Sequence, residues 1–154
     1  MNNPLWIVWM IISARRPSDT YDMPAVSMPF WIRRGFQGMT FFGHIITPDA
    51  EEARHFNHHW DELKNHEMIH LFQARSTHNS WLCFYILYIW YWLRARHYNR
   101  YISNAGYWLN PFEMEAYENM YRMDYLHQRL TATGWKRYAA LPLEERLRLL
   151  TGRD

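Results

Sequence analysis

The sequence lacks several features that would assign it to a common functional class. Cys83 is the only cysteine among 154 residues, which excludes an intrachain disulfide and a zinc site built from four cysteines. The formal net charge is only +2, and the 17 Lys and Arg are scattered along the chain. We therefore expect no nucleic-acid partner. No internal repeat divides the chain, and its length predicts a single domain over residues 1–154.

An apolar run long enough to cross a bilayer is also missing. The longest such run is Trp81–Leu93, with thirteen residues. As a helix it would span about 20 Å, which is short of the roughly 30 Å of a hydrocarbon layer. The shorter run Leu5–Ile12 is followed, not preceded, by basic residues, which is the wrong polarity for a secretory signal. The compartment therefore stays open between the cytoplasm and a membrane surface.

Aromatic side chains, in contrast, are abundant. They make up 18% of the residues, with 9 Trp and 11 Tyr. Large rings bury large areas, so they favour a core built from aromatic packing. Trp and Tyr also favour the headgroup region of a bilayer. We expect Trp81–Leu93 to form a central buried helix, and the alternative is an interfacial helix that gives the protein peripheral membrane contact.

The first third of the chain predicts a small β element and irregular connections. Residues 13–35 contain three prolines with Ser, Asp and Gly between them, which is typical of an irregular connection. Met39–Thr47 is rich in β-branched and aromatic residues and predicts a short strand. Leu5–Ile12 has the same bias and is the predicted partner strand. Residues 1–47 are thus the β and irregular N-terminal part.

Helical signals dominate the remaining chain. Thr47 is the predicted N-cap of a first helix and Pro48 its first residue, and the helical pattern continues to Gln73 with a break near His58. Ser76–Ser80 predicts the turn that precedes the aromatic helix.

A second start signal lies at Asn110 and Pro111, and we expect the helix that it opens to reach about Leu126. Residues 48–128 then form a helical core, and residues 129–154 form a tail with a short amphipathic helix after Gly134. The predicted fold is mainly α (α+β), with three to five helices and a small N-terminal β element.

The segment "NHEMIHLFQ" carries the strongest chemical signal. On a helix, His66 and His70 project from one face about one turn apart, which suits two ligands of a tetrahedral zinc ion. Glu67 lies beside them and can take a proton from an activated water. Chance would produce this pattern about 0.03 times in such a chain. The alternative is a pair of surface histidines. Gln73 would bond a ligand or lie partly exposed.

A catalytic zinc site needs a third protein ligand, which leaves the fourth position open for water. On the last predicted core helix, Glu113 shares its face with apolar residues that must turn inward. A carboxylate there is costly unless something pairs with it. Glu115 shares its face with charged and amide side chains, which is typical of a solvated surface. We expect Glu113 to be the ligand, and Glu115, His44 and His127 remain alternatives.

These motifs resemble those of the gluzincin-type metallopeptidases, in which the HExxH helix is followed by a glutamate ligand on a later helix. Glu113 followed by Ala116 is similar to the phrase found in several of those families, with Tyr117 in place of their Asp. "NHEMIHLFQ" and "PFEMEAYEN" also resemble a group of small, uncharacterised bacterial proteins with HExxHxxQ and FExEAY motifs. That resemblance covers about Gly43–Asn119.

The resemblance implies a bound Zn2+ with His66, His70 and Glu113 as ligands and Glu67 as general base, so that residues 48–128 become a metal-binding core. The Asp that is missing here usually orients a ligand histidine. Tyr117 would orient a ligand in its place, stabilise an oxyanion or only pack.

We therefore expect a zinc-dependent hydrolase, a metallopeptidase that acts on a peptide or protein substrate. Gly43–Thr47 would supply the edge strand that holds an extended peptide. Two alternatives stay open, which are a non-catalytic zinc-stabilised helical module and a membrane-associated interaction protein. The sequence indicates neither the cleavage preference nor the oligomeric state.

Overall fold

The computed structural model describes residues 5–32 and 35–152. The α-helices in this part of the chain are α1 (Leu5–Ser13), α2 (Ala50–His58), α3 (Glu62–Ser76), α4 (Trp81–Ala95), α5 (Ala105–Trp108), α6 (Pro111–Asn119), α7 (Trp135–Ala140) and α8 (Leu143–Thr151). Two 3₁₀ helices are η1 (Pro17–Asp19) and η2 (Arg96–Arg100). The described residues are 58% helical and include a three-stranded sheet, which confirms a mainly helical fold with a small N-terminal β element. There are eight described α-helices rather than three to five, because α1, α5 and α7 form where the sequence predicted a strand, a loop or no element.

The sheet consists of β1 (Ala25–Ser27), β2 (Met39–Phe41) and β3 (His44–Thr47), in the order β1-β3-β2. The single strand expected over Met39–Thr47 is a hairpin, in which β2 and β3 pair antiparallel. Phe42 and Gly43 form its turn with φ angles of 44° and 82°. A two-residue hairpin turn of the I′ type needs positive φ at both positions, and glycine supplies the second without strain.

The prediction that Leu5–Ile12 forms the partner strand is wrong. These residues form helix α1, and the position beside β3 is taken by β1, which pairs with it in parallel. α1 places Met10 against Met28 and Ile46. Strand propensity depends on the surface that a segment covers, so tertiary packing overrides it here. The segment 13–35, expected to be wholly irregular, contains β1 and η1.

The helix starts and the break near His58 are largely as expected. α2 ends at His58 and α3 begins at Glu62. The N-cap of α2 is Asp49 rather than Thr47, and the first helical residue is Ala50 rather than Pro48, because the Asp49 carboxylate accepts hydrogen bonds from two backbone N–H groups of the first turn. Asn110 caps α6 and Pro111 opens it, as predicted.

α6 ends at Asn119 rather than near Leu126. The side-chain amide of Asn65 on α3 donates to the carbonyls of Met120 and Arg122, at 2.8 and 3.2 Å. Those carbonyls are thereby satisfied outside a helix, and the chain continues in turns.

The expectation of a central buried α4 is wrong for one side of the helix. Its buried residues are Trp81, Phe84 and Ala95, whereas its outer side is exposed. Within the described ranges, no helix has the length and apolar character needed to span a membrane.

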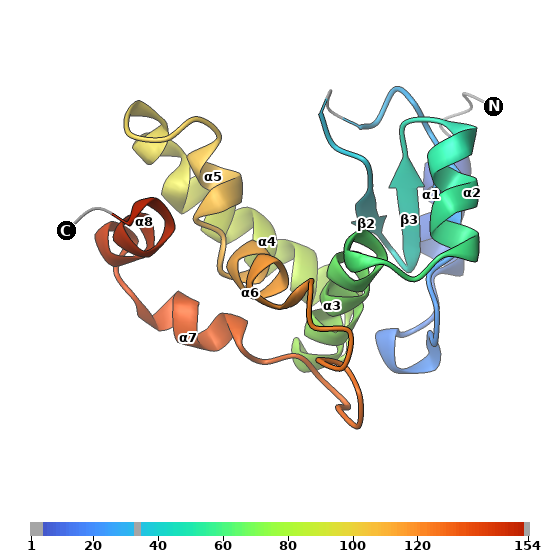
Figure 1. The fold of residues 1–154 in the computed structure, drawn as a ribbon. Coiled ribbons are helices and arrows are strands. Elements are labelled where there is room, and N and C mark those ends of the chain that lie inside the picture. The colour runs from blue at the N-terminus through green and yellow to red at the C-terminus, as the bar shows by residue number, and fades with distance from the viewer. Residues whose placement is uncertain (1–4, 33–34, 153–154) are drawn as a thin grey trace.

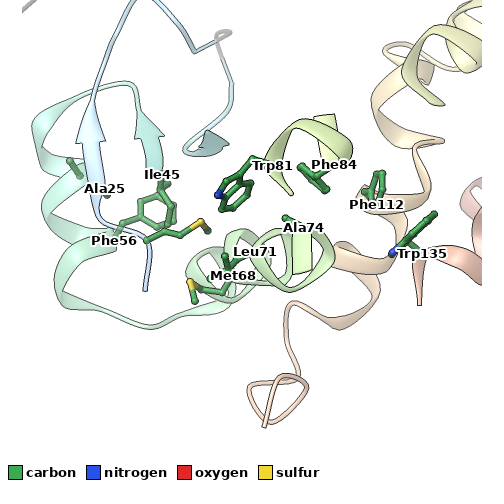
Figure 2. Packing of buried hydrophobic residues seen from close by; sticks show 12 residues of the cluster. Ala25, Ile45, Phe56, Met68, Leu71, Ala74, Trp81, Phe84, Phe112 and Trp135 are labelled. Carbon is green, nitrogen blue, oxygen red and sulfur yellow. The ribbon is translucent and has the colours of Figure 1, made fainter. Parts of the chain in front are cut away.

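The main hydrophobic core links the sheet to both groups of helices. In Figure 1, α3 lies between the sheet with α1 and α2 on one side and α4 to α8 on the other. Figure 2 shows the core passing through this arrangement, with Ala25, Ile45, Phe56, Met68, Leu71, Ala74, Trp81, Phe84, Phe112 and Trp135. α3 is therefore held on several sides at once, and it carries the HExxH motif.

Candidate metal centre

Three candidate ligands converge between α3 and α6. His66, His70 and Glu113 each offer a ligand atom, and these atoms lie within 4.8 Å of one another. The Nε2 atoms of the two histidines are 3.2 Å apart, and Glu113 oxygens lie 3.2 Å from His66 Nε2 and 3.5 Å from His70 Nε2. All three side chains are buried. Among the residues that the structure describes, this is the one cluster of metal-ligand type.

The local sequence explains this convergence. The four-residue spacing aligns the two histidines on α3, on the side that packs against α6. Asn110 and Pro111 fix the start of α6, so Glu113 falls in its first turn. The positive end of the helix dipole favours a carboxylate at that position.

The electrostatics of the cluster follow from burial and close opposite charges. Burial would lower the pKa of His70, but the Glu113 carboxylate raises it to about 9. For Glu113, burial would raise the pKa, yet His70 and His66 hold it well below its usual range. The cluster therefore keeps Glu113 ionised and holds a proton when no metal is bound.

Tyr88 of α4 fixes the Glu113 carboxylate. Its hydroxyl donates to Glu113 Oε1 at 2.7 Å. Burial, and then the nearby carboxylate, raise the pKa of Tyr88 well above its usual value. The phenol thus stays protonated and donates, which leaves Oε2 of Glu113 directed to His66.

A second chain of hydrogen bonds orients His70. His70 Nδ1 donates a hydrogen bond to Gln73 Oε1 at 2.8 Å, because an amide oxygen can only accept. The Gln73 amide nitrogen donates to Glu115 Oε2 at 2.8 Å and to the Phe112 carbonyl at 2.9 Å. His70 therefore carries a proton on Nδ1, which leaves Nε2 as its ligand atom when a metal is bound.

The prediction that Glu115 lies on a solvated surface is wrong. Its side chain is fully buried and accepts hydrogen bonds from Gln73, from the Tyr125 hydroxyl and from the backbone N–H groups of Gly134 and Trp135. Helical periodicity along α6 could not reveal the segment before α7 that covers this carboxylate. Glu115 therefore acts as a hub for hydrogen bonds and lies outside the ligand cluster.

Glu67 lies next to the cluster and is positioned by the sheet. Its Oε2 accepts a hydrogen bond from Thr40 Oγ1 at 2.6 Å. Thr40 belongs to β2, and its carbonyl accepts from the Tyr85 hydroxyl at 2.8 Å. Glu67 is buried beside the ligands without being one of them, which is the placement that a general base requires.

Tyr117 contacts a ligand by its ring rather than by its hydroxyl. The ring lies 4.5 Å from the His66 ring, edge to face, and the hydroxyl is 2.9 Å from that of Tyr107. The Nδ1 atom of His66 is buried with no hydrogen-bond partner in the described chain. An aspartate-like partner for His66 is thus absent at this position, and the packing of Tyr117 orients the ring instead.

The donor set fits zinc. Two imidazole nitrogens and one carboxylate oxygen in a buried pocket are ligands that zinc accepts in three-residue catalytic sites. His44 and His127 are not members of the cluster. His66 and His70 would present Nε2 atoms and Glu113 its Oε2 atom.

Two neighbouring cavities reach the cluster. One has a volume of about 450 Å³ and is lined by His66, Glu67, His70 and Glu113 together with many aromatic residues. The other, of about 360 Å³, is lined by His66, Glu67, Tyr107 and Tyr117. Space beside the ligands is what an open coordination position requires.

The roles of Thr40, Tyr88 and Tyr107 were not predictable from the sequence. Their contacts arise between segments far apart in the chain, and a hydroxyl on an apolar helix or strand gives only a weak signal.

Searches of known protein families, of curated proteins and of solved structures return no match to this chain.

Proposed function

We propose that the protein is a zinc-dependent hydrolase of the metallopeptidase kind, with His66, His70 and Glu113 as zinc ligands and Glu67 as general base. The observation that carries this proposal is the approach of three buried ligand atoms to within 4.8 Å of one another, with Glu67 and open space beside them. The resemblance to gluzincin-type metallopeptidases points to the same set.

Zinc, when bound, acts as a Lewis acid that activates water and polarises a carbonyl. The protein's own groups supply the proton transfers. The Glu67 carboxylate takes the proton of the attacking water and then gives it to the leaving amine. Thr40 holds this carboxylate in place through its hydroxyl. Gln73 fixes the orientation of His70, and Tyr88 fixes that of Glu113. The position of the substrate carbonyl relative to the Glu67 carboxylate would therefore stay constant.

The edge strand that would bind a peptide is β2. Gly43–Thr47, expected in that role, contains β3, which is the middle strand. In the hairpin Phe41 pairs with His44 at the turn, so the preceding residue, Thr40, directs its backbone N–H and C=O away from β3. The C=O already accepts a hydrogen bond from the Tyr85 hydroxyl at 2.8 Å, so the Thr40 N–H is the group that would meet a peptide. β2 also lines the larger cavity. An extended peptide added to this edge would pass the metal ligands.

The non-catalytic alternative, a zinc-stabilised module, has one observation in its favour. All three candidate ligands are at most 5% exposed, as in sites whose metal only supports the fold. The cavity beside them favours catalysis, and turnover separates the two functions.

The test is hydrolysis of a fluorogenic peptide library by zinc-loaded protein, with Glu67→Gln beside it. We expect Glu67→Gln to keep its zinc and to lose at least a hundredfold in rate. Glu62→Gln, on the same helix but outside the cluster, is the matched control and should keep its activity. Equal rates in wild type and Glu67→Gln would reject Glu67 as the base. Bound zinc without turnover of any library member would favour the non-catalytic module.

A further inference from the structure

α4 presents an uninterrupted apolar stripe to solvent. Leu82, Ile86, Ile89 and Leu93 recur at helical spacing with Trp90 beside them, and their exposed fractions run from 50% to 62%. In a water-soluble helix this side would carry polar residues. A contiguous exposed apolar patch marks a surface that another phase or partner covers.

The exposed charges at the C-terminal end of this stripe are mainly positive. Arg94, Arg96 and Arg100 are exposed at the C-terminal end of α4 and in η2. No carboxylate of the described chain forms an ion pair with them, and the sequence has no Asp or Glu between Glu67 and Glu113. Glu144 of α8 reaches η2, where it accepts a hydrogen bond from the Tyr98 hydroxyl. The exposed positive groups therefore favour an anionic partner.

The arginines also lie over aromatic rings. The guanidinium of Arg94 is 5.7 Å from the Trp90 ring, and that of Arg96 is 5.0 Å from the Trp92 ring. Arg100 lies 4.7 Å from the Tyr101 ring. Trp, Tyr and Arg at the end of an apolar stripe match the boundary between headgroups and acyl chains, where rings take an intermediate depth and cations meet phosphate.

The same face continues to the cavity at the candidate metal centre. Ile89 of the stripe and Trp31, both about half exposed, line the larger cavity together with His66 and Glu113. Residues that line a cavity and are exposed lie at its mouth. Ile32 lines this cavity too and packs against the cluster under α1. α1 itself exposes Leu5, Trp6, Val8, Trp9, Ile11 and Ile12.

We propose that this face docks on an anionic lipid bilayer, with α4 lying along the headgroup boundary and the mouth of the cavity towards the lipid. From Leu82 to Leu93 the stripe is roughly 16 Å long, too short to cross a hydrocarbon layer of roughly 30 Å, so α4 lies in the plane of the interface. A protein partner is the weaker match, since an interface of that kind carries hydrogen-bonding groups around its apolar centre. Docking uses none of the three candidate ligands, so it holds with or without the metal.

The test is co-sedimentation of the metal-free and zinc-loaded full chain with vesicles of phosphatidylcholine, with and without phosphatidylglycerol. We expect binding that strengthens with phosphatidylglycerol and weakens with added salt. The double variant Ile86→Glu/Leu93→Glu should bind at least tenfold more weakly, because two apolar side chains that enter the bilayer on docking are replaced by charged ones. Leu149→Glu on α8, where the leucine is 57% exposed, is the matched control and should bind like the wild type.

Three results would overturn the proposal. The first is no binding to either vesicle. The second is equal weakening by Leu149→Glu, which would indicate unspecific adhesion. The third is self-association that the double variant abolishes while vesicles fail to bind, which would assign the face to a second copy of the chain. Circular dichroism of each variant shows whether its helices are intact.

Discussion

α3 and α4 have the same length, and their burial is the reverse of what their sequences suggest. α3 buries ten of its fifteen residues, and six of those ten are polar or charged. α4 contains a run of thirteen apolar residues, yet three of its residues are buried. Burial therefore follows the elements that surround a helix rather than its mean hydropathy. α3 is enclosed by the sheet, α4 and α6. Each of its six buried polar side chains forms at least one hydrogen bond there, although Asn65 Oδ1 and His66 Nδ1 have no partner in the described chain.

The difference has a functional meaning. Buried polar side chains are costly unless they are satisfied, so the paired polar groups on α3 form a site with fixed geometry. Exposed apolar side chains on α4 contribute little to folding of the isolated chain and are free to serve in binding. The predictions below test this contrast, in order of decreasing effect.

The largest effect is expected at the hub under α3. Glu115→Ala removes an acceptor from four donors, those of Gln73, Tyr125, Gly134 and Trp135, of which Gly134 is partly buried and the others are buried. The Gln73 amide keeps the Phe112 carbonyl as a second acceptor. Each unsatisfied group costs about 1–3 kcal/mol, so we expect the free energy of unfolding to fall by roughly 4 kcal/mol or more. Urea unfolding measures it.

The control for that variant is Glu118→Ala on the same helix. Glu118 forms an exposed ion pair with Arg137, and such pairs contribute about 0–1 kcal/mol. Similar losses for the two variants would show that the Glu115 network does not stabilise the fold.

The second prediction compares one substitution on the two helices. Ile69 of α3 is fully buried, whereas Ile86 of α4 is 59% exposed. Ile69→Ala should lower the free energy of unfolding by about 3 kcal/mol through lost burial and a cavity. Ile86→Ala should lower it by less than about 1 kcal/mol. A loss at Ile86 as large as that at Ile69 would mean that the outer side of α4 is covered in the folded protein in solution.

The third prediction concerns the side chain that ends α6. Asn65→Ala removes donors to the carbonyls of Asn119, Met120 and Arg122. Because buried carbonyls lose their partner, we expect a loss of about 2 kcal/mol in the free energy of unfolding. Hydrogen exchange should speed up most in the turns after Asn119. Unchanged exchange there would contradict the role assigned to Asn65.

The smallest effect is a pH dependence at the start of α3. A hydrogen bond to Asp61, at 2.6 Å, raises the pKa of His55, and for Asp61 burial is outweighed by that bond, which lowers its pKa. Because the histidine pKa is raised on folding, this contribution to stability is complete below the ordinary value of about 6.5. It is lost as the pH rises through the folded-state pKa of His55.

An NMR titration of the His55 ring measures this. Asp61→Asn keeps an N-cap for α3 and should return the pKa of His55 towards its ordinary value. A titration curve that is the same in both proteins would contradict the pairing.

The sequence predicts local features of this molecule well and contacts between distant segments poorly. The spacing of His66 and His70 and the start of α6 at Pro111 depend on a few neighbouring residues, and these predictions agree with the structure. Glu113 was predictable because a carboxylate on an apolar helix face calls for a partner. The burial of Glu115 was not, because it depends on the Gly134 and Trp135 backbone some twenty residues away.

The same limit explains the two largest differences in the fold. Leu5–Ile12 has the composition of a strand, and only the presence of β1 beside β3 leaves it to form a helix. The apolar run of α4 predicts burial, and only the arrangement of the other helices leaves its outer side exposed. Both outcomes depend on which other elements cover a given surface of the fold, and the composition of one segment does not encode that.

We propose that His66, His70 and Glu113 hold one metal ion. Elemental analysis of protein purified without added metal, beside Glu113→Ala and the control His55→Ala, tests it most directly. We expect about one zinc per chain in the wild type and in His55→Ala, and far less in a folded Glu113→Ala. Zinc retained in Glu113→Ala, or no zinc in the wild type even after zinc is supplied, would contradict it.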